Sequence, residues 1–493
     1  MELAQLKSLK SIQLTIPGIY GLELYPFQKV GVAAIQSTPR MILGDDVGLG
    51  KTIQSVAAIQ LLHNTEELEC QDTLIICPKT VRPDWFKAIR AYTALTPIIG
   101  DETDKDCKYL SRKWNVLILG YPTSRVRVAH LIKVPWKMII LDEGMFKNAD
   151  SKTFAAIRQL TDKAQRVLIL NATSLEVSLG EIYSHIELAS PGLISFEEFK
   201  SRFCKIEKQY FKTKYKTLKY NEKIVGPKSI ESLRELKELM SKFYLKRAYA
   251  DVSIQLPEKI VKNIRVDLLP VQNKAYLAEV KKYRDKEIKG AALLYNLLRI
   301  CDGKLDNWRN EKNPEEVSAK GQALMPLVSS LGNQQGIVYS TYIDPLLAAA
   351  KIVKNMGKTI GFYTGKNEDT REKYFDAFKE GKIDWLFITK AAQRGKNLEN
   401  CAHMIMLNQL YNASARTQLE GRISRINSTH KNIFIYNLIA AETVEENVLD
   451  LLDQRETISE YINEDGDGFK DLTDAQVDKM LKIRESLIQE FKY

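Results

Sequence analysis

A glycine-rich stretch near the amino terminus, GDDVGLGKTIQ, combines residue types that hold a polyphosphate. Gly48 and Gly50 let the backbone approach an anion and point successive N–H groups at it. Lys51 then supplies a positive charge for the β- and γ-phosphates, and Thr52 supplies a hydroxyl for Mg²⁺. The match to the strict phosphate-loop pattern is incomplete, because Asp45 stands where that pattern has its first glycine. The stretch predicts a phosphate site, and the alternative is a structural strand-to-helix turn.

A second stretch, IILDEGMFKN, places two carboxylates directly after an apolar run. In this position Asp142 can face the magnesium of a phosphate loop, and Glu143 can face an attacking water. The two stretches together predict that ATP and Mg²⁺ are the cofactors. Lys51 and Glu143 are then the candidate catalytic residues of this half, and Thr52 and Asp142 are the candidate metal ligands.

These residues need strands to bring them together, and the chain has strand-like runs in two blocks. Short apolar runs alternate with amphipathic helical stretches, which predicts parallel sheets covered by helices and an α/β fold. Between about 176 and 330 the signal fades into charged helical sequence, so we expect two α/β domains separated by helical insertions. The predicted strands lie within 41–43, 73–78, 114–122, 136–144 and 166–174, and within 336–342, 359–365, 385–391, 403–409 and 433–439.

Composition narrows the class of protein. The 493 residues are 44% hydrophobic, which is ordinary for a globular protein and enough for two or three domains. The formal charge of +10 favours a polyanionic partner. The six cysteines form no C-x-x-C pair, so neither structural zinc nor a disulfide framework is expected. With no long apolar run and no signal-like amino terminus, we expect a cytoplasmic protein, or a nuclear one if eukaryotic, with no membrane partner.

Taken in order, the motifs resemble those of the Swi/Snf-like branch of the superfamily 2 helicase-type motor ATPases, from about residue 20 to 455. An acidic residue at the position of Asp45 is usual in that branch. The segment 243–259 resembles the branch signature Leu-x-Arg…Asp-Val…Leu-Pro. The other matching segments are LYPFQKVGV (24–32), LIICPKTVRPDWFKAI (74–89), KAAQRGKNLENCAHMIMLN (390–408) and QLEGRISRI (418–426).

The resemblance implies a fold, a division of the chain and roles for single residues. It implies two RecA-like parallel-sheet lobes, over 1–250 with an insertion at about 176–250 and over 251–456 with a helical insertion at about 268–330, followed by a helical tail at 457–493. Gln28 would read the adenine base, Arg425 would act as an arginine finger on the γ-phosphate, and Arg422 would assist it or brace the domain interface. The other nucleotide contacts would be Asp46, Gly48, Leu49, Gly50, Gly395 and Gln418. DNA contacts would be Lys79, Thr80, Thr341, Thr389 and Lys390.

Two motifs depart from the family pattern. The usual Asp-Glu-Ala-His is Asp-Glu-Gly-Met, so Met145 follows Gly144 where a histidine normally couples the ATP site to the next motif. That next motif, usually Thr-Gly-Thr-Pro, is Asn171-Ala172-Thr173-Ser174. Because Asp142 and Glu143 are intact, hydrolysis is expected to survive, and the communication between ATP and nucleic acid is what these changes put in doubt.

A basic and aromatic patch, KQYFKTKYKTLKYNEK at 208–223, suits contact with nucleic acid. Lysines neutralise phosphates and aromatic rings stack on unpaired bases, and the alternative is a solvated β-hairpin with alternating faces. The layout is most similar to annealing helicases and fork-remodelling motors, in a compact viral (phage) or bacterial form. The DNA-binding residues predicted here are Lys208, Tyr210, Phe211, Lys212, Lys214 and Tyr215.

The sequence therefore predicts an ATP-dependent motor that binds duplex and branched DNA without sequence preference and migrates or reverses DNA junctions. Two alternatives stay open: a translocase that displaces proteins from DNA, and an ATP-switched clamp without processive movement. The stretch 463–474 has oxygen-bearing residues at the spacing of a calcium loop, but Lys470 stands where an apolar residue is usual, so we expect a helix-terminating turn.

Overall fold

The structure is a computed structural model that divides into two compact units, Met1–Ile254 and Gln255–Tyr493. It describes residues 3–446 apart from 66, 69–70, 145–150, 172–178, 213–217, 253–256, 286, 289, 304–317, 368–369, 391–397, 411–415, 417–418, 425–427 and 429.

The first unit is built on a seven-stranded sheet in the order β3-β4-β2-β5-β6-β1-β9, and every neighbouring pair is parallel. Its central strands β2, β4, β5 and β6 are mostly apolar and almost entirely buried because both faces are covered, as parallel sheets require. Alternate residues of β1 and β2 enter two separate cores, one on each face. The strands are Arg40–Leu43 (β1), Thr73–Cys77 (β2), Pro97–Ile99 (β3), Val116–Gly120 (β4), Met138–Asp142 (β5), Arg166–Leu170 (β6) and Tyr244–Leu245 (β9).

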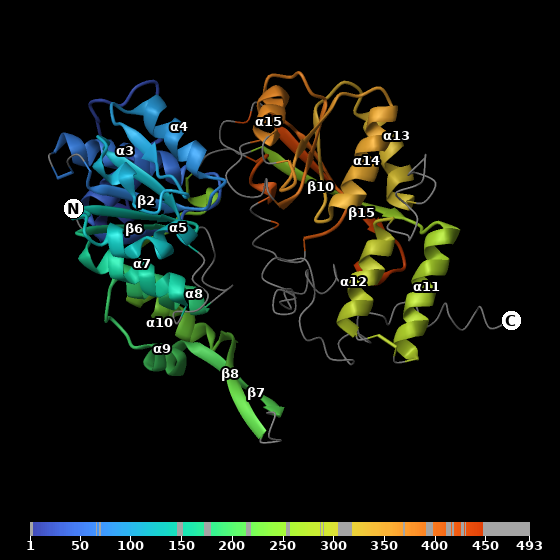
Figure 1. Cartoon of the computed structure of the whole chain (residues 1–493), viewed down its shortest axis with the longest axis horizontal. Helices are drawn as coiled ribbons and strands as arrows, with labels where there is room; N and C mark the ends of the chain where they lie inside the picture. Colours follow the sequence, from blue (N-terminus) through green and yellow to red (C-terminus); the bar gives the residue numbers. More distant parts are fainter. Residues whose placement is uncertain are drawn as a thin grey trace. The chain divides into compact units, whose positions relative to one another are not determined.

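Helices cover the two faces of this sheet (Figure 1). One core contains residues of α2, α3 and α4, and the opposite core contains residues of α6, α7 and α8. The helices are Leu3–Lys7 (α1), Pro26–Ser37 (α2), Lys51–Asn64 (α3), Arg82–Tyr92 (α4), Tyr121–Val126 (α5), Val128–Leu131 (α6), Lys152–Lys163 (α7) and Leu179–Ala189 (α8), with 3₁₀ turns at Lys108–Ser111 and Tyr249–Val252.

An antiparallel hairpin projects from the first unit beyond two further helices, α9 (Phe196–Phe203) and α10 (Ile230–Met240) (Figure 1). Its strands are β7 (Cys204–Lys212) and β8 (Leu218–Pro227). In the backbone register Tyr210 lies opposite Tyr220. The described parts of the basic and aromatic patch, 208–212 and 218–223, therefore lie on the two strands of a hairpin, and residues 213–217 lie outside the described part of the chain.

The second unit is built on a six-stranded parallel sheet in the order β10-β15-β14-β11-β13-β12. β10 is one of the two edge strands, and all of its residues are exposed or half-buried. The central strands β11, β13 and β14 are buried along their whole length. The strands are Glu258–Val266 (β10), Gly336–Tyr339 (β11), Ile360–Tyr363 (β12), Trp385–Ile388 (β13), His403–Met406 (β14) and Asn432–Ala440 (β15).

The helices of the second unit are divided between its sheet and a separate helical pair. α13 and α14 pack on one face of the sheet and α15 packs on the other. α11 and α12 pack against each other and against residues that follow β15 (Figure 1). The helices are Pro270–Arg284 (α11), Gly290–Cys301 (α12), Ala319–Ser330 (α13), Ile343–Asn355 (α14) and Arg371–Lys379 (α15).

The structure confirms the predicted α/β fold with two parallel sheets, and it corrects part of the strand assignment. β10 lies in the stretch that the sequence analysis assigned to charged helical segments. The pattern of an edge strand is weak because one side and one face meet solvent, so polar residues are tolerated there. No helix of the described residues is long and apolar enough to cross a membrane. The calcium-like stretch 463–474 lies outside the described residues.

Candidate ATP and DNA sites

The predicted phosphate loop and the predicted acidic pair lie at one edge of the first sheet. β6 lies between β1 and β5, and its last residue, Leu170, is level with both Leu43 and Asp142. The loop after β1 and the acidic pair at the end of β5 therefore lie at the same edge of the sheet, with only β6 between their two strands. This edge is where the carboxyl ends of parallel strands place ligands in open α/β sheets.

The loop between β1 and α3 has the geometry of an anion cradle. Gly48 and Gly50 adopt φ of 96° and 76°, and Gly50 is the N-cap of α3, so the loop ends at a helix N-terminus. The ammonium of Lys51 donates to the carbonyl oxygens of Asp45 at 2.5 Å and Asp46 at 3.2 Å. Left-handed glycines, a helix N-terminus and an ammonium folded onto the loop fit a polyphosphate, so these residues fit ATP.

Gln28 contacts this loop directly. Its amide nitrogen donates to the Leu49 carbonyl at 3.2 Å, and its side-chain oxygen accepts from the Tyr25 N–H at 3.0 Å. A β-carbon at Gly50 would lie 2.5 Å from the Gln28 amide nitrogen, so a side chain there would displace Gln28 and would also be strained by the positive φ. The structure therefore places Gln28 against the loop, and its role in reading the base stays a prediction.

Asp142 of the acidic pair is held by two aromatic side chains that the sequence did not point to. The Trp85 indole donates to a carboxylate oxygen of Asp142 at 2.7 Å, and the Tyr121 hydroxyl donates to the Asp142 carbonyl at 3.0 Å. Burial and the nearby Asp142 raise the pKa of Tyr121 well above its usual value, so the hydroxyl stays a donor. Glu143 has φ of 50°, which a residue with a side chain adopts when surrounding contacts impose it.

A buried histidine joins the two turns whose motifs depart from the family pattern. The His185 Nε2 lies 2.9 Å from the Gly144 carbonyl, and its Nδ1 lies 3.2 Å from the Asn171 amide nitrogen. Burial lowers the pKa of His185 to about 4, so the ring is neutral at physiological pH. Nε2 then donates to the carbonyl while Nδ1 accepts from the amide. His185 was missed because α8 brings it to the site from beyond both motifs.

The carboxyl edge of the second sheet gathers three of the predicted DNA contacts. Thr341 follows β11, and Thr389 and Lys390 follow the adjacent β13, with Tyr339 level with Ile388. The Thr341 N–H donates to the Asn408 side-chain oxygen at 2.9 Å. In the first unit Lys79 and Thr80 follow β2, and Lys79 is exposed. Both groups of predicted DNA contacts therefore lie in loops that follow the carboxyl ends of parallel strands.

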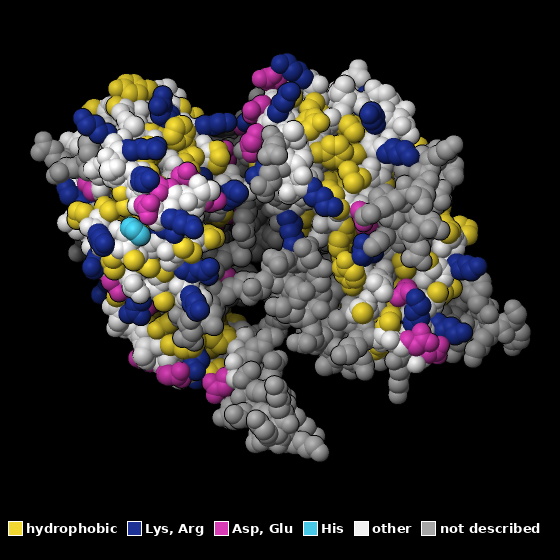
Figure 2. Space-filling view, viewed as in Figure 1, with side chains coloured by type: hydrophobic (Ala, Val, Ile, Leu, Met, Phe, Trp, Pro, Cys, Tyr) yellow, Lys and Arg dark blue, Asp and Glu magenta, His cyan; other side chains and the backbone are white. Residues whose placement is uncertain are grey.

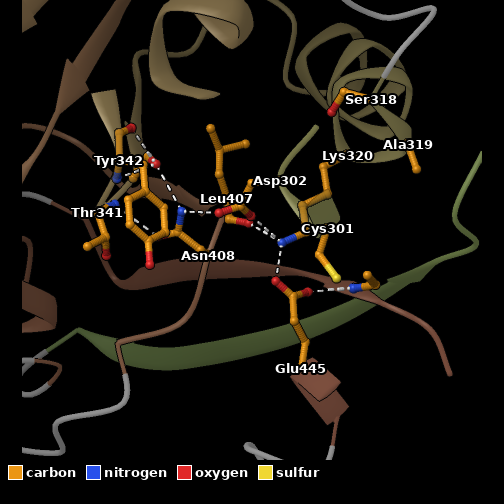
Figure 3. Close-up of polar contacts among 12 residues, drawn as sticks. Cys301, Asp302, Ser318, Ala319, Lys320, Thr341, Tyr342, Leu407, Asn408 and Glu445 are labelled. Carbon is orange, nitrogen blue, oxygen red and sulfur yellow. Dashed lines mark hydrogen bonds and ion pairs between the residues drawn. The ribbon is translucent and has the colours of Figure 1, made fainter. Parts of the chain in front are cut away.

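A cluster of buried charged side chains lies next to the loops at the carboxyl edge of the second sheet (Figure 3). The Lys320 ammonium donates to Asp302 at 2.7 Å, to Glu445 at 2.6 Å and to the Leu407 carbonyl at 2.6 Å. Burial and the neighbouring Asp302 raise the pKa of Glu445 to about 7, although Lys320 opposes the shift. The Asn408 amide donates to Asp302 at 2.8 Å and so links this cluster to the backbone of Thr341. We call Lys320, Asp302, Glu445 and Asn408 the Lys320 cluster.

Several predicted site residues lie outside the described part of the chain. Of the two predicted arginines, Arg422 is buried and its N–H donates to the Leu419 carbonyl at 3.0 Å. Lys208, Tyr210, Phe211 and Lys212 lie on β7. Those outside the described residues are Met145, Ala172, Thr173, Ser174, Lys214, Tyr215, Gly395, Gln418 and Arg425.

Basic side chains on the first unit do not single out a DNA path. Figure 2 shows Lys and Arg scattered over its visible face, among acidic and apolar side chains. Some lysines and arginines of the first unit are paired with acidic side chains, as in the Arg158–Glu187 and Arg202–Glu235 contacts. The overall charge of +10 therefore indicates attraction to a polyanion without fixing where the polyanion binds.

Comparison with known proteins assigns the family. Residues 27–305 match the model of the SNF2-related domain, and residues 319–427 match the helicase conserved C-terminal domain. The first match covers more than half of the chain, so the chain belongs to the SNF2-related family. This confirms the resemblance to Swi/Snf-like superfamily 2 proteins that the motifs indicated.

Three relatives show what the chain is similar to. The putative ATP-dependent helicase/translocase YwqA of Bacillus subtilis is 25% identical, over 93% of this chain and 51% of that protein. The DNA repair and recombination protein RAD54-like of Danio rerio is 21% identical, over 97% and 72%. A solved SWI2/SNF2 ATPase core of Sulfolobus solfataricus in complex with double-stranded DNA is 22% identical, over 96% and 99%, with a TM-score of 0.45. The chain spans about half the length of several curated relatives that it matches.

Proposed function

We propose that the chain is a DNA-dependent ATPase that moves along duplex DNA and remodels branched DNA. The observation that carries this is the meeting of the phosphate loop with Asp142 and Glu143 at one sheet edge. Membership of the SNF2-related family supports the ATP-driven part, since relatives such as YwqA are named ATP-dependent helicases or translocases. The relative named for DNA repair and recombination favours branched DNA as a substrate.

Each residue of the ATP site has a distinct task in this proposal. Bound with Mg²⁺, ATP supplies the phosphoanhydride bond whose hydrolysis drives movement. Lys51 neutralises charge on the β- and γ-phosphates, and Thr52 and Asp142 hold the metal. Glu143 orients the attacking water and accepts its proton. Trp85 fixes the carboxylate of Asp142 through the 2.7 Å indole contact, so the metal side is organised before ATP binds.

Contacts to DNA are proposed to be with the backbone. Lys79 and Thr80 in the first unit, and Thr341, Thr389 and Lys390 in the second, offer an ammonium, a hydroxyl or a backbone N–H. Such groups bind phosphates and do not read bases, so binding is insensitive to sequence and weakens with salt. The β7–β8 hairpin is proposed to engage DNA junctions through its lysines and aromatic residues.

A second candidate function is a translocase that displaces proteins from DNA. The name of the Bacillus relative, helicase/translocase, favours it, and it needs no preference for junctions. An ATP-switched clamp is a weaker alternative that follows from the altered Asp-Glu-Gly-Met and Asn-Ala-Thr-Ser motifs. Junction preference separates the first two functions, and DNA-stimulated turnover separates both from the clamp.

The test compares ATPase rates with no DNA, linear duplex, single strands and a model fork, in wild type and in a hairpin variant. The variant replaces the hairpin aromatics Tyr210, Phe211, Tyr215 and Tyr220 by alanine. We expect stimulation by linear duplex to persist while fork regression is lost, because base stacking is worth about 1–3 kcal/mol per base engaged. Equal losses on linear and branched DNA would favour the translocase, and absence of stimulation in wild type would favour the clamp.

A further inference from the structure

A segment from the end of the first unit runs alongside the first half of the phosphate loop. β9 is a two-residue strand beside β1, but its backbone hydrogen bonding continues past the last residue of β1. Three N–H groups donate to it at alternate positions: Ile42 to the Phe243 carbonyl at 2.7 Å, Gly44 to Leu245 at 2.7 Å, and Asp46 to Arg247 at 3.0 Å. The backbone of the loop is therefore hydrogen-bonded, as far as Asp46, to a segment about two hundred positions further along the chain.

Side chains strengthen this attachment. Arg247 donates through Nε to one carboxylate oxygen of Asp45 at 2.9 Å and through Nη2 to the other. The Asp45 side chain is 0% exposed and that of Arg247 is 11% exposed. Gln54 of α3 closes the arrangement, because its amide nitrogen donates to Asp45 at 3.1 Å and its oxygen accepts from Arg247 at 2.8 Å. Arg247 also donates to the Phe27 carbonyl and lies over the Phe27 ring.

The surrounding helix leaves room for this pair. Gly31 lies within α2, where glycine is unfavourable by roughly 1 kcal/mol relative to alanine. A β-carbon at Gly31 would lie 1.8 Å from the Gln54 side-chain oxygen and 2.8 Å from Arg247 Nη2. The glycine in this helix is therefore explained by the space that the ion pair and its amide partner occupy.

The ion pair reaches the ammonium of Lys51 through a single residue. The carboxylate of Asp45 is bound by Arg247, while the carbonyl of the same Asp45 accepts from Lys51 at 2.5 Å. A two-pronged arginine–carboxylate contact fixes the orientation of both groups. Because Asp45 is held at its side chain, its carbonyl is held too, and with it the place from which the Lys51 ammonium starts.

We propose that Arg247 is a positioning residue for the phosphate loop, which sets through Asp45 the position from which Lys51 meets the phosphates of ATP. This rests on the proposed function, since it takes ATP as the ligand of the loop. It also gives a physical role to the aspartate that stands in place of the first glycine of the strict pattern. The aspartate is the anchor to which the Leu-x-Arg segment binds.

Arg247→Ala alone cannot test the proposal, because it leaves the Asp45 carboxylate buried without a cation and destabilises the fold. The decisive variant is the double change Asp45→Asn with Arg247→Ala, which removes both charges. We expect the double variant to recover thermal stability relative to Arg247→Ala, while its KM for ATP stays about tenfold or more above wild type. Recovery of both stability and KM would overturn the proposal, because the pair would then be structural alone.

Two further variants test the same point without a buried unpaired charge. Arg247→Lys keeps the charge but loses the two-pronged contact, and Gly31→Ala pushes on the pair from α2. Both are expected to raise the KM for ATP, and a wild-type KM in both would overturn the proposal. The matched control is Arg166→Ala, which removes a cation that pairs with Glu67 and donates to the Gln36 carbonyl. This control should lower the melting temperature and leave the KM for ATP unchanged.

Binding of a fluorescent ATP analogue to wild type and to Lys51→Ala separates this proposal from the proposed function. If wild type binds the analogue and Lys51→Ala does not, the loop is the ATP site, and the Arg247 variants then decide the positioning role. If wild type binds no analogue, the proposed function fails first, and the positioning proposal fails with it.

Discussion

At the carboxyl edge of each sheet a cationic side chain with little exposure binds carboxylates. In the first unit the cation contacts a residue of the phosphate loop itself, and in the second unit it is linked to the loop after β11 only through Asn408. In the first unit Arg247 binds Asp45, which is itself a residue of the phosphate loop. In the second unit Lys320 binds Asp302 and Glu445, and Asn408 passes that constraint on to Thr341. A change at Arg247 is therefore expected to act on the phosphate loop through Asp45, whereas a change at Lys320 is expected to act first on the fold of the second unit.

The largest expected effect tests whether the second unit contributes to hydrolysis at all. The resemblance assigns stabilisation of transition-state charge to Arg425, so Arg425→Ala is expected to lower turnover roughly 10³-fold or more, with DNA binding largely kept. Steady-state ATPase and DNA binding by fluorescence anisotropy measure the two quantities. Arg416→Ala is the control, since Arg416 pairs with Glu420 at 2.9 Å and is expected to cost little turnover. Lost DNA binding with unchanged hydrolysis would contradict the assignment.

The next largest effect is expected from removing the cation of the Lys320 cluster, which supports the carboxyl edge of the second sheet. Lys320→Met leaves Asp302 and Glu445 buried without their cation, which is expected to cost about 3–5 kcal/mol of stability. Hydrogen exchange of the backbone amides of β11 and β14, the two strands that end beside the cluster, measures the loss of local stability. Lys358→Met is the matched control, because Lys358 is a half-buried lysine whose ammonium donates to the Gly332 carbonyl near the surface. Unchanged exchange in Lys320→Met would show that the Lys320 cluster does not hold this edge.

A smaller effect is the dependence of stability on pH that is expected from His185 in the first unit. Burial lowers the pKa of His185 to about 4, below the ordinary value near 6.5, so the unfolded chain binds a proton that the folded chain excludes. Stability from this group is present above pH 6.5 and is lost as the pH falls to 4, by about 3 kcal/mol. His185→Gln should flatten this part of the profile of unfolding free energy against pH, whereas the exposed His130→Gln should not. An unchanged profile in His185→Gln would contradict the buried neutral ring.

The sequence predicted the strand ends well because chemistry and pattern coincide there. Lys51 and Asp142 each follow a short apolar run, and such runs become buried parallel strands whose carboxyl ends meet. The edge strand β10 was missed because its residues face solvent and lack a continuous apolar pattern. The roles of Arg247 and Lys320 could not be predicted, because each depends on pairing between segments more than a hundred positions apart.

The most direct test of the central claim, that the edge joining the phosphate loop to the acidic pair hydrolyses ATP, is Glu143→Gln. The change removes the base and keeps the shape, so the variant is expected to bind ATP at least as tightly as wild type and to lose turnover. Binding of radiolabelled ATP and release of phosphate are measured on the same preparation, with and without duplex DNA. Bound ATP with no phosphate release is the predicted result. Phosphate release near the wild-type rate would contradict the account.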